Sequence, residues 1–173
     1  MKLPEVLAVT DNYLLTLPSG SDISIPLSQP NFEPWQGPKP EDTYGEKSVL
    51  NHNGYPVLPE ILILKKLQEV GWNGVWVDTF RNRFLKEYFL EKVEVELPEH
   101  RLQLFKKIEN KIERSSGCLD VYCWKDDQIL FAEAKRKNND QIRDNQKVWI
   151  QGALEVGISK DSLLIVEWTN NDV

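Results

Sequence analysis

The sequence contains Cys118-Leu-Asp-Val-Tyr-Cys-Trp124, then Lys125-Asp-Asp-Gln128, then Ile129-Leu-Phe-Ala-Glu-Ala-Lys135. The two outer stretches are rich in β-branched, aromatic and other apolar residues, which favour strands. The polar stretch between them is short enough to close a hairpin. We therefore predict two neighbouring antiparallel strands, and we place the other elements of the fold around them.

The register of this hairpin follows from its loop. Closure through residues 125–128 pairs Trp124 with Ile129, and the same register places Asp120 directly opposite Glu133. The two side chains then share one face of the sheet, with their Cβ atoms about 5 Å apart. Lys135 lies two residues beyond Glu133, so it points to the same face.

Two carboxylates this close repel each other, and a hard cation such as Mg²⁺, with Mn²⁺ as a substitute, resolves the repulsion. A lysine beside such a cation can hold an attacking water. Asp120, Glu133 and Lys135 therefore indicate metal-dependent hydrolysis of a phosphodiester. The acid-x-lysine pattern also occurs at Glu109-Asn-Lys111, so a solvated strand edge stays the alternative for Glu133 and Lys135.

Residues 140–156 predict a helix, capped by Asn139 or Asp140 and closed by Gly157. Gln146 interrupts its apolar stripe, which consists of Ile142, Trp149, Ala153 and Val156. One interpretation is a core glutamine that is hydrogen-bonded internally. The other is an amide directed at a water or a phosphate in the site.

An earlier helix is predicted from Pro59 to Val70, because proline is tolerated at the first helical position and Gly71 ends the pattern. Glu60 shares a stripe with Leu64 and Leu67, so it points inward. It is either a further acid of the site or a first-turn glutamate that interacts favourably with the helix dipole.

Basic residues flank the hairpin and the helix that follows it: Arg136, Lys137, Arg143 and Lys147. They form either a solvated face or a phosphate-binding patch. The net charge of −6 does not exclude a nucleic-acid partner. Residues 1–60 hold three basic and eight acidic residues, so the remaining chain is nearly balanced.

The order of elements predicts an α/β fold with a mixed central sheet flanked by helices. Residues 1–58 are acidic and proline-rich, and we expect an irregular arm or a hairpin that packs on the core. The main domain then covers 59–173, with a strand at 75–80 and a buried strand at 163–168. A charged insertion over 81–116 is predicted to hold a strand at 92–97 and a helix at 98–112.

Composition excludes several classes of protein. With 40% hydrophobic and 28% charged residues, the chain can form a core and is not intrinsically disordered. Cys118 and Cys123 point to opposite faces of a strand, so they cannot bond to each other, and two histidines exclude a multi-histidine metal site. The longest apolar run, 61–64, is too short for a membrane span. We expect a cytoplasmic protein.

These residues resemble the PD-(D/E)XK nuclease superfamily, and most closely its VRR-NUC branch, the virus-type replication-repair nucleases. The resemblance covers about 59–168. It is strongest in the motifs Gly117-Cys-Leu-Asp-Val121, Ile129 to Lys135, Asp144-Asn-Gln-Lys-Val-Trp149 and Gly157. Leu119 departs from the pattern, which has proline there. The resemblance implies a restriction-endonuclease-like sandwich.

The resemblance also implies a role for each site residue. Asp120 and Glu133 would be metal ligands, Lys135 the catalytic lysine, Gln146 the helix amide and Glu60 the acid of the first helix. The implied activity is a Mg²⁺-dependent DNA endonuclease or structure-selective repair nuclease, with a homodimer as an open possibility. The alternative is a catalytically silent nuclease-like module that binds nucleic acid or a protein partner.

Overall fold

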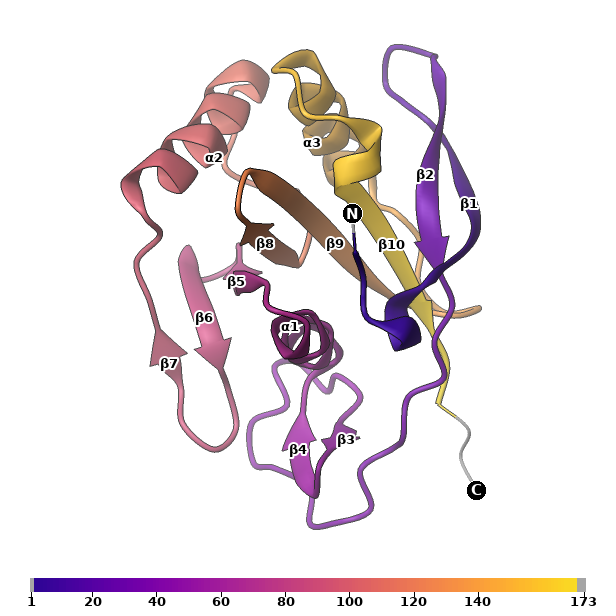
Figure 1. Ribbon diagram of the computed structural model, residues 1–173, viewed down its shortest axis with the longest axis vertical. Coiled ribbons are helices and arrows are strands. Elements are labelled where there is room, and N and C mark those ends of the chain that lie inside the picture. The colour runs from indigo at the N-terminus through magenta and orange to yellow at the C-terminus, as the bar shows by residue number, and fades with distance from the viewer. Residues whose placement is uncertain (1, 171–173) are drawn as a thin grey trace.

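The computed structural model describes residues 2–170, which fold around one mixed sheet of eight strands (Figure 1). In chain order the elements are η1 (Glu5–Leu7), β1 (Val9–Thr16), β2 (Asp22–Ser28), β3 (Leu50–His52), β4 (Tyr55–Val57), α1 (Pro59–Glu69), β5 (Asn73–Asp78), β6 (Arg83–Glu87), β7 (Val93–Glu94), α2 (Glu99–Ile112), β8 (Val121–Lys125), β9 (Gln128–Arg136), α3 (Asp144–Glu155), η2 (Lys160–Ser162) and β10 (Leu163–Trp168). The α/β class with a mixed sheet is thereby confirmed.

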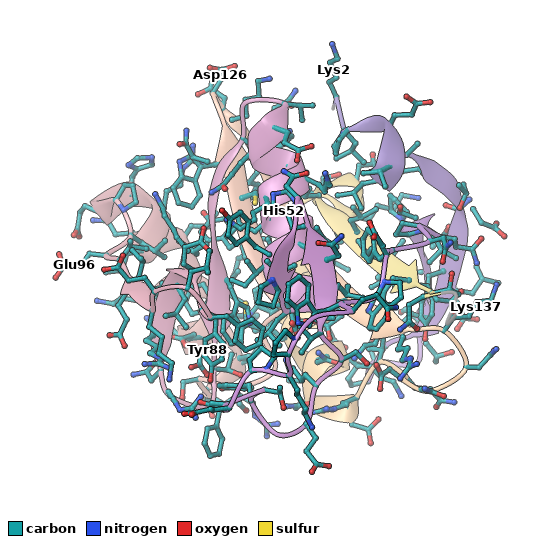
Figure 2. The ribbon with its side chains drawn as sticks, turned by 90° about the horizontal axis from the view of Figure 1, so that it is seen from below. Lys2, His52, Tyr88, Glu96, Asp126 and Lys137 are labelled. Atoms are coloured by element: carbon teal, nitrogen blue, oxygen red, sulfur yellow. The ribbon has the colours of Figure 1, made fainter. Side chains whose placement is uncertain are left out.

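The strands of the main sheet lie in the order β1-β2-β10-β9-β8-β5-β6-β7. The interior strand β10 runs parallel to both of its neighbours, β2 and β9, and the other neighbouring pairs run antiparallel. The short strands β3 and β4 form a separate hairpin. Figure 2 views the molecule from the end where this hairpin lies and labels His52 on β3.

Helices cover both faces of the sheet. α1 packs on one face, against residues such as Trp76, Val121 and Cys123. The helices α2 and α3, which lie side by side in Figure 1, cover the other face with Tyr122 and Phe131 beneath them. Consecutive residues of β8 thus alternate between the two cores, as the pleat of a strand requires.

The core beneath α3 is aromatic. The ring of Phe131 stacks on Tyr122, with centroids 4.3 Å apart, and meets Trp149 of α3 edge-on at 4.8 Å. Cys118 belongs to this core and Cys123 to the one beneath α1. Both thiols are free and buried, so the prediction that they do not pair is confirmed.

The hairpin of β8 and β9 has the predicted register. Trp124 pairs with Ile129, and the ladder continues in the same register to Val121 and Ala132. The turn is shorter than expected, because residues 125 and 128 also pair, which leaves two residues in the turn. Asp120 directly precedes β8 at the end of this ladder.

The helix predicted over 140–156 begins four residues later than expected. Its first residue is Asp144, because Arg143 has an extended backbone with ψ 159°. Asp140 instead accepts a hydrogen bond from the backbone N–H of Arg136, at 2.9 Å, and so belongs to the preceding turn. This loop brings the start of α3 back to the end of β9.

The insertion is part of the sheet. α2 occupies nearly the predicted range 98–112, but β7 has two residues where the sequence predicts a strand over 92–97. β6 is a strand that the sequence analysis does not identify. The strand predicted over 75–80 ends at Asp78, and residues 79–82 form an exposed turn into β6.

The N-terminal segment contains a hairpin, β1 and β2, that continues the main sheet. Leu15 and Ile25 of this hairpin are buried in the core beneath α3. The chain between Gln29 and Val49 then runs without long elements toward β3 and α1. Within residues 2–170, no helix has the length and apolar character needed to cross a bilayer.

Candidate functional site

A cleft of about 590 Å³ opens where the first turn of α1, the end of β5, the segment just before β8, the end of β9 and the start of α3 meet. All five residues that the sequence predicts for the catalytic and metal site line this cleft: Glu60, Asp120, Glu133, Lys135 and Gln146. Because α1 and α3 cover opposite faces of the sheet, the cleft draws side chains from both layers of the fold.

Asp120 and Glu133 are held together by an exchange of hydrogen bonds with the backbone. Oε2 of Glu133 accepts from the N–H of Asp120, at 3.1 Å, and Oδ2 of Asp120 accepts from the N–H of Ala134, at 3.0 Å. Burial, together with the negative charges of Glu133 and Glu60, raises the pKa of Asp120 well above its ordinary value. A cation bound beside Asp120 would relieve this cost.

Glu133, Lys135 and Gln146 form a buried polar network. Their exposed fractions are 2%, 6% and 8%. Nζ of Lys135 lies 2.8 Å from Oε1 of Glu133 and donates to Oε1 of Gln146 at 3.2 Å, while Nε2 of Gln146 donates to Oε1 of Glu133 at 2.6 Å. An ammonium has three N–H donors, so this network leaves one of them for a ligand in the cleft.

The start of α3 is fixed against the hairpin. The backbone N–H of Arg143 donates to Oε1 of Gln146, at 3.0 Å, so the amide also satisfies a free donor at the beginning of the helix. Gly117 lies against the same turn with φ of +91°, and a Cβ there would come within 2.2 Å of the carbonyl oxygen of Asn145. Glycine at position 117 therefore allows the strand and the helix to meet closely.

Glu60 lies in the first turn of α1 and is 5% exposed. Its Oε1 accepts a short hydrogen bond from Lys47, and its Oε2 is buried without a hydrogen-bond partner among the described residues. A buried carboxylate oxygen without a donor is costly. The sequence interpretation of Glu60 as a purely dipole-stabilising residue does not account for this burial.

Lys47 is a residue of this cleft that sequence reasoning missed. It comes from the segment before β3, and no local motif surrounds it. Burial would lower the pKa of Lys47, but the carboxylates of Glu60, Asp120 and Glu133 raise it above its ordinary value. A lysine in an otherwise acidic segment is a weak signal, and only the tertiary structure connects it with the cleft.

The residues of the cleft fit a small divalent cation with incomplete protein coordination. Among residues 2–170, no group of three or more His, Cys, Asp or Glu side chains is close enough to hold a metal by itself. Oδ1 of Asp120 accepts no hydrogen bond from the described residues, and Oε2 of Glu133 accepts one. Mg²⁺ keeps several waters and often binds through one or two carboxylates, so Asp120 and Glu133 could supply the protein's share of its ligands.

The four predicted basic residues divide into two pairs. Arg136 and Arg143 line the cleft, and Arg136 is held by Ser48 at 3.3 Å. Lys137 is exposed outside the cleft, at the periphery of the view in Figure 2. Lys147 also lies outside it and pairs with Asp144 of its own helix. Of these four residues, Arg136 and Arg143 are therefore the two that can contact a ligand in the cleft.

No family model, no curated protein and no solved structure matches the chain.

Proposed function

We propose that this protein is a metal-dependent nuclease of the PD-(D/E)XK type, with a restriction-endonuclease-like arrangement and a site similar to that of the VRR-NUC branch. The observation that carries the proposal is the buried network of Glu133, Lys135 and Gln146 beside Asp120. Burial of two charged groups and an amide is costly, and it is more easily explained by a chemical task than by stability. The expected substrate is nucleic acid, with DNA favoured.

Asp120 and Glu133 would hold the Mg²⁺ ion in this proposal. The negative charge of Glu60 lies close enough to Asp120 to raise the pKa of that carboxyl group. The bound ion would stabilise the negative charge that develops on the phosphate during hydrolysis. Burial and the neighbouring acids disfavour the charge of Asp120, so a divalent cation bound there would be favoured by relief of that cost.

The chain's own residues would position the reacting groups. In hydrolysis, a water oxygen forms a new bond to phosphorus, one ester P–O bond breaks, and the leaving oxygen takes up a proton. The free N–H donor of Lys135 would orient the water or a phosphate oxygen. Gln146 would hold Lys135 and Glu133 in place, and Arg136 and Arg143 would bind the phosphates on either side.

A catalytically silent module that binds nucleic acid or a protein partner is the second candidate. It is favoured by one observation: each acid of the cleft already has an internal partner. Lys47 contacts Glu60, Lys135 contacts Glu133, and the Ala134 N–H donates to Asp120. A decayed site would nevertheless be expected to lose one of the catalytic residues, and the set of Asp120, Glu133 and Lys135 is complete.

The proposal is tested with three variants: Asp120→Asn, Glu133→Gln and Lys135→Met. Mg²⁺ and Mn²⁺ binding is measured by calorimetry, and cleavage is measured on labelled single-stranded, duplex and branched DNA and on RNA. We expect the two acid variants to lose metal binding and cleavage. Lys135→Met should keep metal binding and lower turnover by about 10²-fold or more.

Melting temperatures in metal-free buffer provide the control for folding. Asp120→Asn retains an oxygen for the Ala134 N–H and removes a charge that burial and neighbouring acids disfavour, so its melting temperature should hold or rise. Absence of metal binding by the wild type would reject the nuclease proposal and leave the silent module. Cleavage that persists in both acid variants would reject the assignment of the site.

A further inference from the structure

Phe80 is the most exposed large apolar side chain of the described residues, with an exposed fraction of 85%. The other exposed large apolar residues lie away from the cleft: Val6, Val9, Leu14, Tyr55 and Leu90. Phe80 alone among these lines it, together with the candidate metal ligands. Burial of a phenylalanine side chain is favourable, so an exposed one that lines a cleft is a candidate for contact with a ligand.

The turn that carries Phe80 is fixed by a buried carboxylate. Asp78, at the end of β5, is 1% exposed. It accepts hydrogen bonds from the backbone N–H of Arg81 at 3.1 Å, from Nε of Arg83 at 2.9 Å and from the hydroxyl of Tyr44. These three donors anchor the turn on both sides of Phe80, which distinguishes this residue from an apolar residue on an unconstrained loop.

The surroundings of the ring are cationic and aromatic. The guanidinium of Arg81 lies 4.4 Å from the centroid of the Tyr44 ring and 5.9 Å from that of Phe80. Beyond β8, which separates β5 from β9 in the sheet, the same cleft is lined by Arg136 and Arg143. A ligand that fits both sides has a flat apolar face and an anionic backbone.

We propose that Phe80 is a stacking site for an unpaired nucleobase, so that the substrate is single-stranded nucleic acid or a branched form with unpaired bases. This inference rests on the proposed function. The faces of bases inside a continuous duplex are covered by their neighbours, whereas those of an unpaired strand are free to stack on an aromatic side chain. The cleft volume of about 590 Å³ lies in the range of small-ligand pockets, roughly 300–1,000 Å³, which suits part of one strand and not a duplex.

The test asks whether the loss of the Phe80 ring and the loss of one base affect binding affinity through the same contact. A fluorescent single-stranded DNA of 12 nucleotides is titrated with the protein, with Ca²⁺ in place of Mg²⁺, and anisotropy gives the affinity. A series of strands carries one abasic position, moved along the sequence. In the wild type, one abasic position should weaken binding by about 5- to 150-fold, and Phe80→Ala should weaken binding of the intact strand by a similar factor.

Combining Phe80→Ala with the abasic strands isolates the contact between the ring and one base. In Phe80→Ala, the sensitive abasic position should cost no further affinity, while Phe80→Trp should retain wild-type behaviour. Leu90→Ala, an exposed apolar residue that is 66% exposed outside the cleft, is the matched control and should bind the strand as the wild type does. The corresponding duplex should show no dependence on Phe80.

Equal affinity of Phe80→Ala and the wild type for the single strand would overturn the inference, and so would additive losses from Phe80→Ala and every abasic position. Failure of the wild type to bind the strand would overturn it as well. Coupling without any hydrolysis would leave the stacking site standing and reject the nuclease. Hydrolysis without coupling would reject the stacking site and retain the nuclease.

Discussion

Gln146 connects α3 to both charged residues of the buried network. Its amide donates to Glu133 and its carbonyl accepts from Lys135 and from the Arg143 N–H. Gln146→Leu leaves all three without this partner, so we expect a loss of about 1–3 kcal/mol in the free energy of unfolding. We also expect slower cleavage per folded molecule, because Lys135 and Glu133 lose their positioning. Denaturant titrations and single-turnover rates measure the two effects.

Gln151→Leu is the matched control on the same helix, since its amide bonds at the surface to Ser19 and Glu155. It should change stability by no more than about 0.5 kcal/mol and leave cleavage unaltered. A loss of stability in Gln146→Leu with an unchanged rate per folded molecule would make Gln146 a purely structural residue.

Lys47 places a positive charge among three acids of the cleft. Lys47→Met keeps most of the aliphatic chain and removes the ammonium. Without metal, the melting temperature should fall because Glu60, Asp120 and Glu133 repel one another more strongly. Mg²⁺ should then stabilise the variant more than the wild type, because the ion no longer competes with the ammonium for the same carboxylates. Thermal shifts across a Mg²⁺ titration measure the difference.

Lys39→Met is the control for Lys47→Met, since Lys39 is an exposed lysine of the same segment outside the cleft. Its Mg²⁺-dependent shift should match that of the wild type. An equal shift in Lys47→Met would show that Lys47 and the ion do not share the acids.

The elements that the sequence predicts best are those that local chemistry determines. The register of β8 and β9 follows from one turn, so the proximity of Asp120 and Glu133 could be inferred before the structure. The range of β10 is also as predicted, because the apolar run over 163–166 and Trp168 define it, with only Glu167 as a polar interruption. The start of α3 was wrong by four residues, since the side chain of Asp140 favours a turn over the first turn of the helix.

Features that depend on distant segments were not predictable in this way. The parallel pairing of β2 with β10 joins residues far apart in the chain, and no local pattern specifies it. The contact of Lys47 with Glu60 is of the same kind. Phe80 was placed at the end of a strand because aromatic residues favour strands, whereas hydrogen bonds to Asp78 end β5 and turn the chain.

The turn between β5 and β6 depends on Asp78. Burial would raise the pKa of Asp78, but hydrogen bonds from Tyr44, Arg83 and the Arg81 N–H lower it below its ordinary value of 3.8. The charged form is thus favoured by folding, so this stabilisation is present above the unfolded-state pKa and is lost as the pH falls through the lower folded-state value. Asp78→Asn should cost about 1–3 kcal/mol at pH 7.

The pH dependence identifies the cause of that loss. The difference in stability between the wild type and Asp78→Asn should be constant near neutral pH and should shrink below about pH 4. Asp127→Asn, in the exposed turn between β8 and β9, is the control and should show little difference at any pH. A difference for Asp78→Asn that persists undiminished at pH 3 would show that shape, and not charge, holds the turn.

The molecule as a whole depends on its N-terminal hairpin. β2 covers one side of β10, whose other side pairs with β9, the strand that carries Glu133 and Lys135. The hairpin also contributes apolar side chains to the core beneath α3: Leu15, Leu17, Ile25 and Leu27. At about 1.5–3 kcal/mol for each buried side chain, their sum is comparable with the whole stability of a domain, about 5–15 kcal/mol.

We therefore expect the hairpin and the rest of the sheet to unfold in one transition. Ile25→Ala removes a side chain with 0% exposure and should lower the free energy of unfolding by about 2–5 kcal/mol. Leu14→Ala, on the adjacent strand and 79% exposed, should change it by no more than about 0.5 kcal/mol. Tryptophan fluorescence reports on both cores, since Trp149 belongs to the one beneath α3 and Trp76 to the one beneath α1, and circular dichroism reports on the backbone of the whole chain. If the hairpin is integral, both signals shift together in Ile25→Ala. A main transition that stays at the wild-type position would instead make residues 9–28 an independent appendage.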